Sequence, residues 1–249
     1  LLTVAREGLT GPLAYTYGTT SGSASIQEDN TVTFYSNITG EATTFDTAYF
    51  TDDGAGEFVH EGVTIPTGQL SGTDAAAGLL ATTASTSIYT TASGASFSAV
   101  YDLAGVASTQ SRCFIVDNSV RAQEGYVLPG SDFTSPLASA SPNSAFQHHG
   151  GSWMLYGSNA DGADWVVRDG AVVAKTGDEI FPGAGLFWGA TFFSATYFMV
   201  ASNNAGDYVV GGVFEGPDLA NAALVLNGER IIARENDPID LNGDGVFDD

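Results

Sequence analysis

The sequence predicts an all-β protein: a β-propeller-like array of about four antiparallel blades, each with three to four strands. A short apolar phrase that ends in Gly or Asn returns five times along the 249 residues. Asp-Gly and Asn-Gly pairs stand between apolar runs, which is the strongest short-range signal for a β-hairpin. Charged residues make up only 14% of the chain, and Gly, Ser, Thr and Ala are abundant. This composition suits short strands and turns better than helices.

Each copy of the repeated phrase ends at an anchor residue, and a proline follows within a few positions. The anchor is Gly or Asn, the residues that most readily take a positive φ, so we expect the chain to turn there at the end of a strand. The proline then prevents further strand pairing. The five copies cover residues 4–8, 58–62, 120–125, 172–177 and 231–236.

An apolar strand and a tight turn precede the later copies of the phrase. The turns are Asp169-Gly170 and Asn227-Gly228, and they define the last two strands of their units. Further strands are predicted upstream, and the Gly/Ser/Thr-rich stretches 18–30 and 71–94 are interpreted as connections between units. The upstream strands are expected at 32–35, 97–101, 152–156, 197–201 and 208–214.

The units are roughly 50 to 60 residues long, a period typical of propeller blades. One such sheet cannot bury both of its faces, whereas a ring of sheets can. We therefore expect a repeat domain over residues 1–239, and a β-sandwich built from the same hairpins is the alternative fold. Its units are placed at about 8–62, 63–125, 126–177 and 178–236.

The charge of the chain is strongly negative, with 29 acidic residues against 7 basic ones and a net charge of −22. Such a surface repels phosphate backbones and anionic lipids, so we expect no nucleic-acid partner. It favours cations, although the acidic residues could simply keep the protein in solution. No apolar stretch is long enough for a transmembrane helix, and we expect no membrane insertion.

Several chemically interesting side chains are expected to have structural roles. The single cysteine, Cys113, lies in an apolar run and is predicted to be a buried thiol. Tryptophans at repeat positions usually fill the core between blades, with sugar stacking as the alternative. Acidic pairs at turns and the His148-His149 pair in a loop are weak evidence for catalysis. The residues concerned are Trp153, Trp165, Trp188, Asp52-Asp53 and Asp178-Glu179.

One cycle of the repeat has a recognisable form: an apolar strand, Asp169-Gly170, a second apolar strand, then Gly177-Asp178 and a Pro-Gly pair. It resembles the propeller-like repeats of large secreted and cell-surface proteins of environmental bacteria. The resemblance covers nearly the whole chain. It implies a propeller-like fold and an extracellular or cell-surface location, and it transfers no catalytic residue, so an enzyme is not expected.

The acidic segment 240–249 matches the start of an EF-hand or dockerin-like calcium loop. Its oxygen ligands fall at alternate positions, and Gly245 provides the turn. The bidentate acid of a full loop would come after Asp249, and an acidic solvated tail is the alternative interpretation. The predicted Ca²⁺ ligands are Asp240, Asn242, Asp244, Val246 (through its carbonyl) and Asp248.

The segment Leu1 to Glu7 reads as the final strand of a unit whose other strands are missing. Three explanations remain open. The chain, which begins without Met, is a processed or partial form of a longer protein; the segment closes a ring by displacing the strand at 230–235; or it is donated to the next copy. Donation is a head-to-tail contact that builds a filament if it does not close.

Taken together, the sequence favours an extracellular structural or adhesive protein that is stabilised by calcium and assembles into a homo-oligomer or surface filament. The alternative is a secreted propeller that binds or hydrolyses glycans. A structural protein should show repeating subunit contacts. A lectin or hydrolase should show a concave site with aromatic and acidic side chains.

Overall fold

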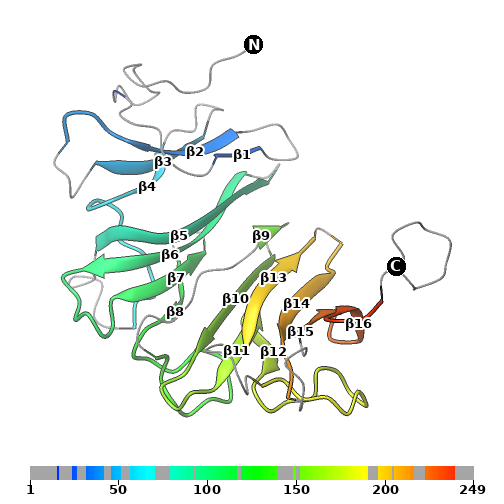
Figure 1. Ribbon diagram of the computed structural model, residues 1–249. Helices are drawn as coiled ribbons and strands as arrows, with labels where there is room; N and C mark the ends of the chain where they lie inside the picture. Colours follow the sequence, from blue (N-terminus) through cyan, green and yellow to red (C-terminus); the bar gives the residue numbers. More distant parts are fainter. Residues whose placement is uncertain are drawn as a thin grey trace.

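The described part of the chain is entirely β-structure. Within it the chain forms sixteen strands and no helix, which confirms the all-β prediction, and it contains no helix long and apolar enough to cross a membrane. The strands form four antiparallel sheets, which follow one another along an arc (Figure 1). The computed structural model describes residues 16, 24–26, 32–41, 46–51, 57–70, 79–91, 94–116, 119–138, 148–149, 152–189, 196–203, 205–215 and 222–238.

Each sheet is a simple up-and-down meander whose four strands are consecutive in the chain. Sheet 1 contains β1 (Ala24–Ile26), β2 (Val32–Asn37), β3 (Thr47–Thr51) and β4 (Glu57–His60). Sheet 2 contains β5 (Leu79–Thr91), β6 (Gly94–Ala104), β7 (Arg112–Val116) and β8 (Ser119–Gln123). Sheet 3 contains β9 (His148–His149), β10 (Ser152–Ser158), β11 (Asp164–Arg168) and β12 (Ala171–Lys175). Sheet 4 contains β13 (Tyr197–Ser202), β14 (Tyr208–Val213), β15 (Ala222–Leu226) and β16 (Arg230–Arg234).

The anchor residues of the repeat have the backbone conformation that the sequence predicts. Gly62, Gly125, Gly177 and Asn236 have φ angles of 69°, 77°, 87° and 63°. Each anchor is the second residue after the last strand of its sheet, where the chain turns away. The residue before each anchor also makes the same backbone bond in every sheet. Its N–H donates to the carbonyl of the residue at or just before the start of the third strand, as from Glu124 to Arg112 at 2.8 Å and from Glu235 to Ala222 at 2.8 Å.

The last strand of each sheet also carries a β-bulge four residues before the anchor. In sheet 2, Ile115 pairs with Val120 and Phe114 pairs with Ala122, so Arg121 is the extra, unpaired residue. A bulge leaves one residue outside the ladder and bends the strand locally. The equivalent extra residues in sheets 1, 3 and 4 are Phe58, Val173 and Ile232.

The core lies between successive sheets, and sheet 3 is buried on both faces. Side chains alternate along a strand, so neighbouring residues point to opposite faces. Trp153 and Trp165 pack in the core shared with sheet 2, whereas Met154 and Val166 pack in the core shared with sheet 4. Trp188 lies in this second core at 2% exposure. The prediction that the tryptophans fill the space between sheets is therefore confirmed, and the arrangement is compatible with the propeller-like fold and with the alternative β-sandwich.

Three segments differ from the sequence-based expectation. The Thr/Ser-rich stretch 71–94 is not only a connection, because it contains the thirteen-residue strand β5. Threonine is β-branched and favours an extended backbone, and β5 pairs along its length with β6 despite its polar composition. The stretch 18–30 likewise contains β1, and His148-His149 forms β9 rather than a loop.

Candidate functional site

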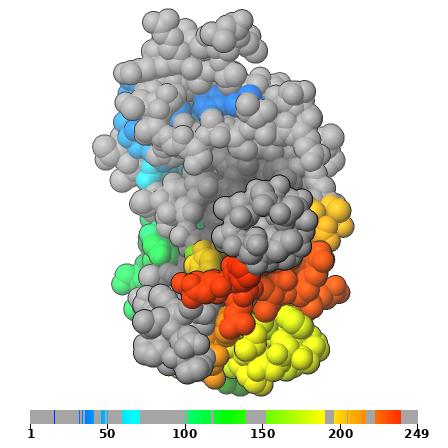
Figure 2. Space-filling model, turned by 45° about the vertical axis from the view of Figure 1, so that its right-hand side comes forward, coloured from blue at the N-terminus to red at the C-terminus, as the bar shows by residue number. Residues whose placement is uncertain are grey.

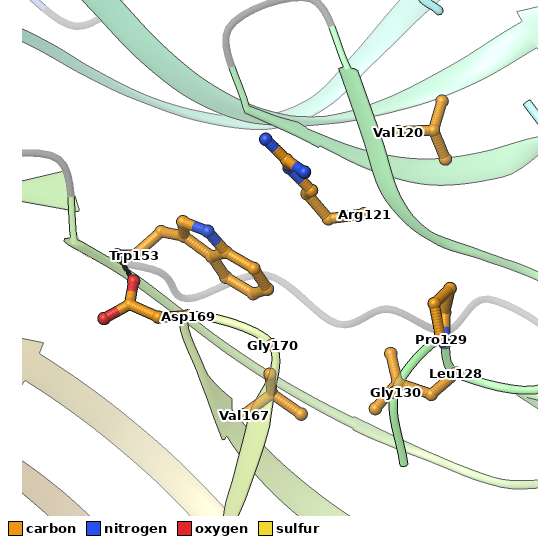
Figure 3. Close-up of a pocket in the computed structure, with 9 residues that line it drawn as sticks. All are labelled: Val120, Arg121, Leu128, Pro129, Gly130, Trp153, Val167, Asp169 and Gly170. Atoms are coloured by element: carbon orange, nitrogen blue, oxygen red, sulfur yellow. Dashed lines mark hydrogen bonds between the residues drawn. The ribbon is translucent and has the colours of Figure 1, made fainter. Parts of the chain in front are cut away.

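A cleft of about 580 Å³ opens between sheets 2 and 3. Strand β8 forms one side of it, and β10 together with the turn between β11 and β12 forms the other (Figure 3). The connection between the two sheets closes one end with a Pro-Gly turn. The lining residues are Val120, Arg121, Leu128, Pro129, Gly130, Trp153, Val167, Asp169 and Gly170.

Two turns form the mouth of the cleft. A Cβ atom on Gly130 would lie 3.5 Å from the carbonyl oxygen of Gly170, so the two turns approach one another closely. Asp169 and Gly170 both have positive φ, at 50° and 87°, as expected for a two-residue hairpin turn of this sequence. The peptide groups of these turns supply polar atoms at the entrance.

The floor of the cleft is apolar and firmly supported. Leu128 is 2% exposed and Val167 is fully buried. Trp153 is 8% exposed, and its ring packs against Phe114 at a centroid distance of 5.3 Å. The indole is therefore held by the inter-sheet core and shows only a small part of its surface to the cleft.

Arg121 supplies the positive charge of the cleft. As the bulge residue of β8 it is exposed, and its guanidinium extends toward the Trp153 side of the open space (Figure 3). Among the residues that the structure describes, no ion pair or hydrogen bond to this side chain is found. A guanidinium offers five N–H donors in a planar fork, which suits a carboxylate or another planar anion.

The negative charge at the other side of the cleft has partners within its own sheet. The carboxylate of Asp169 accepts hydrogen bonds from the N–H of Trp153 and the hydroxyl of Ser152, both at 2.7 Å. The guanidinium of Arg168 lies 3.6 Å from the same carboxylate. Asp169 therefore stabilises the turn, and Arg121 is the charged residue of the described lining that has no ion pair with another described residue.

The equivalent place between sheets 3 and 4 is built differently. The bulge residue there is Val173, which packs against the inter-sheet core together with Tyr208. The guanidinium of Arg168 lies over the Tyr208 ring, 5.1 Å from its centroid. An apolar bulge residue and a cation–π contact thus occupy this junction, whereas the preceding junction presents Arg121, which has no ion pair with another described residue.

Other acidic side chains stabilise turns. The backbone N–H groups of Gly183 and Gly185 each donate to the Glu179 carboxylate at 2.9 Å, and these bonds lower its pKa. Hydrogen bonds from the side chains of Asn227 and Asn203 lower the pKa of Asp207. These contacts agree with the expectation that carboxylates at turns have backbone roles.

The residues predicted to bind Ca²⁺ lie outside the described part of the chain. This applies to Asp240, Asn242, Asp244, Val246 and Asp248, and also to Leu1 to Glu7 and Asp52-Asp53. Within the described ranges, no group of three or more His, Cys, Asp or Glu side chains is placed to hold a metal ion. The calcium loop and the donated strand therefore stay predictions.

Cys113 is fully buried in β7, which confirms the prediction of a structural thiol. Burial raises its pKa to about 12, and the negative charge of Asp102 adds to the effect. The thiolate is the reactive form of cysteine, so this side chain is protected from chemistry in the folded protein.

Comparison with known proteins gives no relative: no family model, no curated protein and no solved structure matches this chain.

The sequence-based reasoning identified the tryptophans but missed Arg121. A signal was present in the repeat itself. At the position four residues before the anchor, the copies have Val4, Phe58, Arg121, Val173 and Ile232. Arg121 is the one charged residue in this set, and it is also the one that lines the cleft.

Proposed function

We propose that this chain is an extracellular structural or adhesive protein of a bacterial cell surface, and that its copies assemble end to end into filaments. The observation that carries the proposal is the outward face of sheet 4. This face is apolar and partly exposed, whereas both faces of sheet 3 are covered by neighbouring sheets.

The register of sheet 4 defines the two faces. Val200, Val210 and Val225 are paired side by side and lie in the core shared with sheet 3. The next row, Met199, Gly211 and Leu224, therefore points the other way. Phe198 lies against this row, since a Cβ atom on Gly211 would be 2.9 Å from its ring, and it is 51% exposed.

A shallow pocket of about 260 Å³ continues the same face along β13 and β14, where Val209 and Leu226 contribute apolar surface. Ile232, the bulge residue of β16, is 47% exposed. Figure 2 shows the last described residues, in red, at the surface of the molecule. No described element covers Phe198 or the row beside it, and exposed large apolar side chains on one face favour an interaction site.

A second copy of the chain is the occupant that fits this face. The two junctions on either side of sheet 3 are formed by sheets of this chain, which pack through apolar residues that alternate along their strands. A sheet from another copy would extend the same mode of packing. Such a contact joins different surfaces of the two copies, and it gives an open chain of subunits if the rotation does not close.

On this proposal, Leu1 to Glu7 and the calcium loop strengthen the contact between copies. Sheet 4 already has its fourth strand, because β16 pairs with β15 over Arg230–Arg234. A donated strand would thus add to the outer edge of β16 as a fifth strand. Calcium bound by Asp240 to Asp248 would neutralise part of the negative charge of the chain and so reduce the repulsion between copies.

Electron microscopy and sedimentation of the purified protein, with and without a calcium chelator, test the proposal. We expect filaments or concentration-dependent oligomers that dissociate on chelation. The variant Phe198→Asp should abolish assembly, because it places a charge in the contact, whereas Glu229→Gln, at an exposed turn of the same sheet, should assemble normally. A monomer at all concentrations, or unchanged assembly of Phe198→Asp, would refute this mode of assembly.

A further inference from the structure

We propose that the cleft between sheets 2 and 3 binds the acidic end of a saccharide, with Arg121 pairing with a sugar carboxylate and the exposed part of the Trp153 indole lying against the sugar ring. This binding site is separate from the assembly face on sheet 4. It adds a ligand to the protein whether or not the copies form filaments.

The first support is the exceptional residue at the bulge. The other described bulge positions hold Phe58, Val173 and Ile232, so the fold accepts an apolar residue there. Arg121 is not needed to form the bulge, and a long charged side chain at this place gains nothing from the apolar core. Its presence at the one bulge that borders the cleft points to a ligand.

The second support is the charge balance. Asp169 is paired with Arg168 and accepts two hydrogen bonds, and no ion pair between Asp169 and Arg121 is found. A guanidinium bound to a carboxylate through two parallel hydrogen bonds is among the stronger polar contacts in proteins. The cleft therefore selects an anionic group at this point.

The third support is the remainder of the lining. Sugars present an apolar ring face and many hydroxyl groups, and they commonly meet an aromatic side chain and backbone polar groups. In the cleft, Trp153 and Leu128 provide apolar surface for the sugar ring. The turns at Gly130 and Gly170 provide backbone polar groups for its hydroxyl groups. Its volume of about 580 Å³ is large enough for one or two sugar rings.

The net charge of −22 restricts the ligand further. A long polyanion would be repelled by the rest of the surface, since the described cleft offers a single unpaired cation. We therefore expect a saccharide with one acidic sugar at its end rather than a polyuronate chain. An acidic peptide would share the carboxylate but would lack the ring that Trp153 contacts.

The inference is tested by titrating the protein with glucuronate and galacturonate. Binding is measured by calorimetry and by changes in the indole N–H signals of NMR spectra. The methyl esters of the same sugars and simple acetate serve as ligand controls. We expect binding of a free uronate, weaker binding of its ester, and no comparable binding of acetate. Because a hydrogen bond to a charged group contributes about 1.5–3 kcal/mol, losing the guanidinium should weaken binding about 10-fold to 100-fold.

Arg121→Val is the matched variant, since Val173 occupies the same bulge in sheet 3. It should keep the wild-type melting temperature and lose uronate binding, and Arg121→Lys should bind with intermediate affinity. Absence of uronate binding by the wild type, equal binding by Arg121→Val, or equal affinity for acetate would each overturn the inference. Peptide binding with the same dependence on Arg121, in place of sugar binding, would also refute the saccharide assignment.

Discussion

The backbone N–H of Trp153 donates a hydrogen bond of 2.7 Å to the carboxylate of Asp169, which connects the start of β10 to the turn between β11 and β12. The same relationship recurs in sheet 4, where the N–H of Tyr208 donates to the side-chain oxygen of Asn227 at 2.8 Å. Both turn residues have positive φ, at 50° and 54°. One repeat thus uses Asp and the next uses Asn for the same contact.

This equivalence predicts how sheet 3 responds to substitution of Asp169. Asp169→Ala should lower the free energy of unfolding by about 1–3 kcal/mol, because it removes the hydrogen bonds and leaves alanine at a positive φ. Asp169→Asn should be tolerated within about 1 kcal/mol, as Asn227 shows. Denaturant unfolding measures both, and equal loss in the two variants would contradict the assigned role.

Substitution of two anchor glycines by alanine distinguishes the cost of a steric clash from the cost of backbone strain. A Cβ atom on Gly125 would lie 2.7 Å from the carbonyl oxygen of Thr109, whereas one on Gly177 would meet nothing within 4 Å. Gly177→Ala should cost about 1–2 kcal/mol from the positive φ alone. Gly125→Ala should cost more, because the clash with backbone is added. Thermal unfolding of the two variants provides the comparison, and an equal loss would show that the backbone at Thr109 yields freely.

Cys113 offers a probe of global unfolding. Its thiol is buried and its pKa is raised to about 12, so very little thiolate forms at pH 8 and reagents cannot reach it. Labelling with a thiol reagent should therefore be slow in the native protein and complete in denaturant. Its rate should fall further in conditions that stabilise the fold. Rapid labelling of the native protein would show that sheet 2 opens locally.

Glu179 should make stability depend on pH in the acid range. Hydrogen bonds from Gly183 and Gly185 lower its pKa below the ordinary value of 4.5. The ionised side chain therefore contributes stability above that pH, and the contribution is lost as the pH falls through the lowered pKa. Glu179→Gln should have a lower melting temperature at neutral pH, and the difference should vanish once the pH lies well below the lowered pKa of Glu179.

The control for this pH series is Glu229→Gln, which removes the same charge from an exposed turn. It should shift the melting temperature little, and its pH profile should run parallel to that of the wild type. A profile of Glu179→Gln that also runs parallel to the wild type would show that the two backbone hydrogen bonds do not depend on ionisation.

The repeat in the sequence predicted most of the fold because its signals are local. Positive φ at Gly125 or Asn236, and hairpins at Asp169-Gly170 and Asn227-Gly228, follow from residues next to each other in the chain. The strand β5 was missed for the opposite reason. Its Thr and Ser residues resemble a connection in composition, and its place in sheet 2 depends on pairing with β6.

The candidate site was harder to predict, since it requires knowing which sheets are neighbours. Arg121 and Trp153 are far apart in the repeat cycle and come together only at the junction of sheets 2 and 3. The burial of Trp165 and Trp188 could be predicted from residue type, because large aromatic side chains gain most from burial. A charged side chain at a cleft has no such general signature, and only comparison among the repeat copies reveals Arg121.

The bulge in the last strand of each sheet has a consequence for how such a protein diversifies. The bulge residue takes no part in strand pairing, so exchanging it leaves the register on either side intact. After a repeat unit is duplicated, this position is free to change while its neighbours keep the sheet folded. A single substitution at this position can therefore change the side chain that one junction presents to a ligand. The same position could be used in protein design to alter the binding specificity of one junction without changing the others.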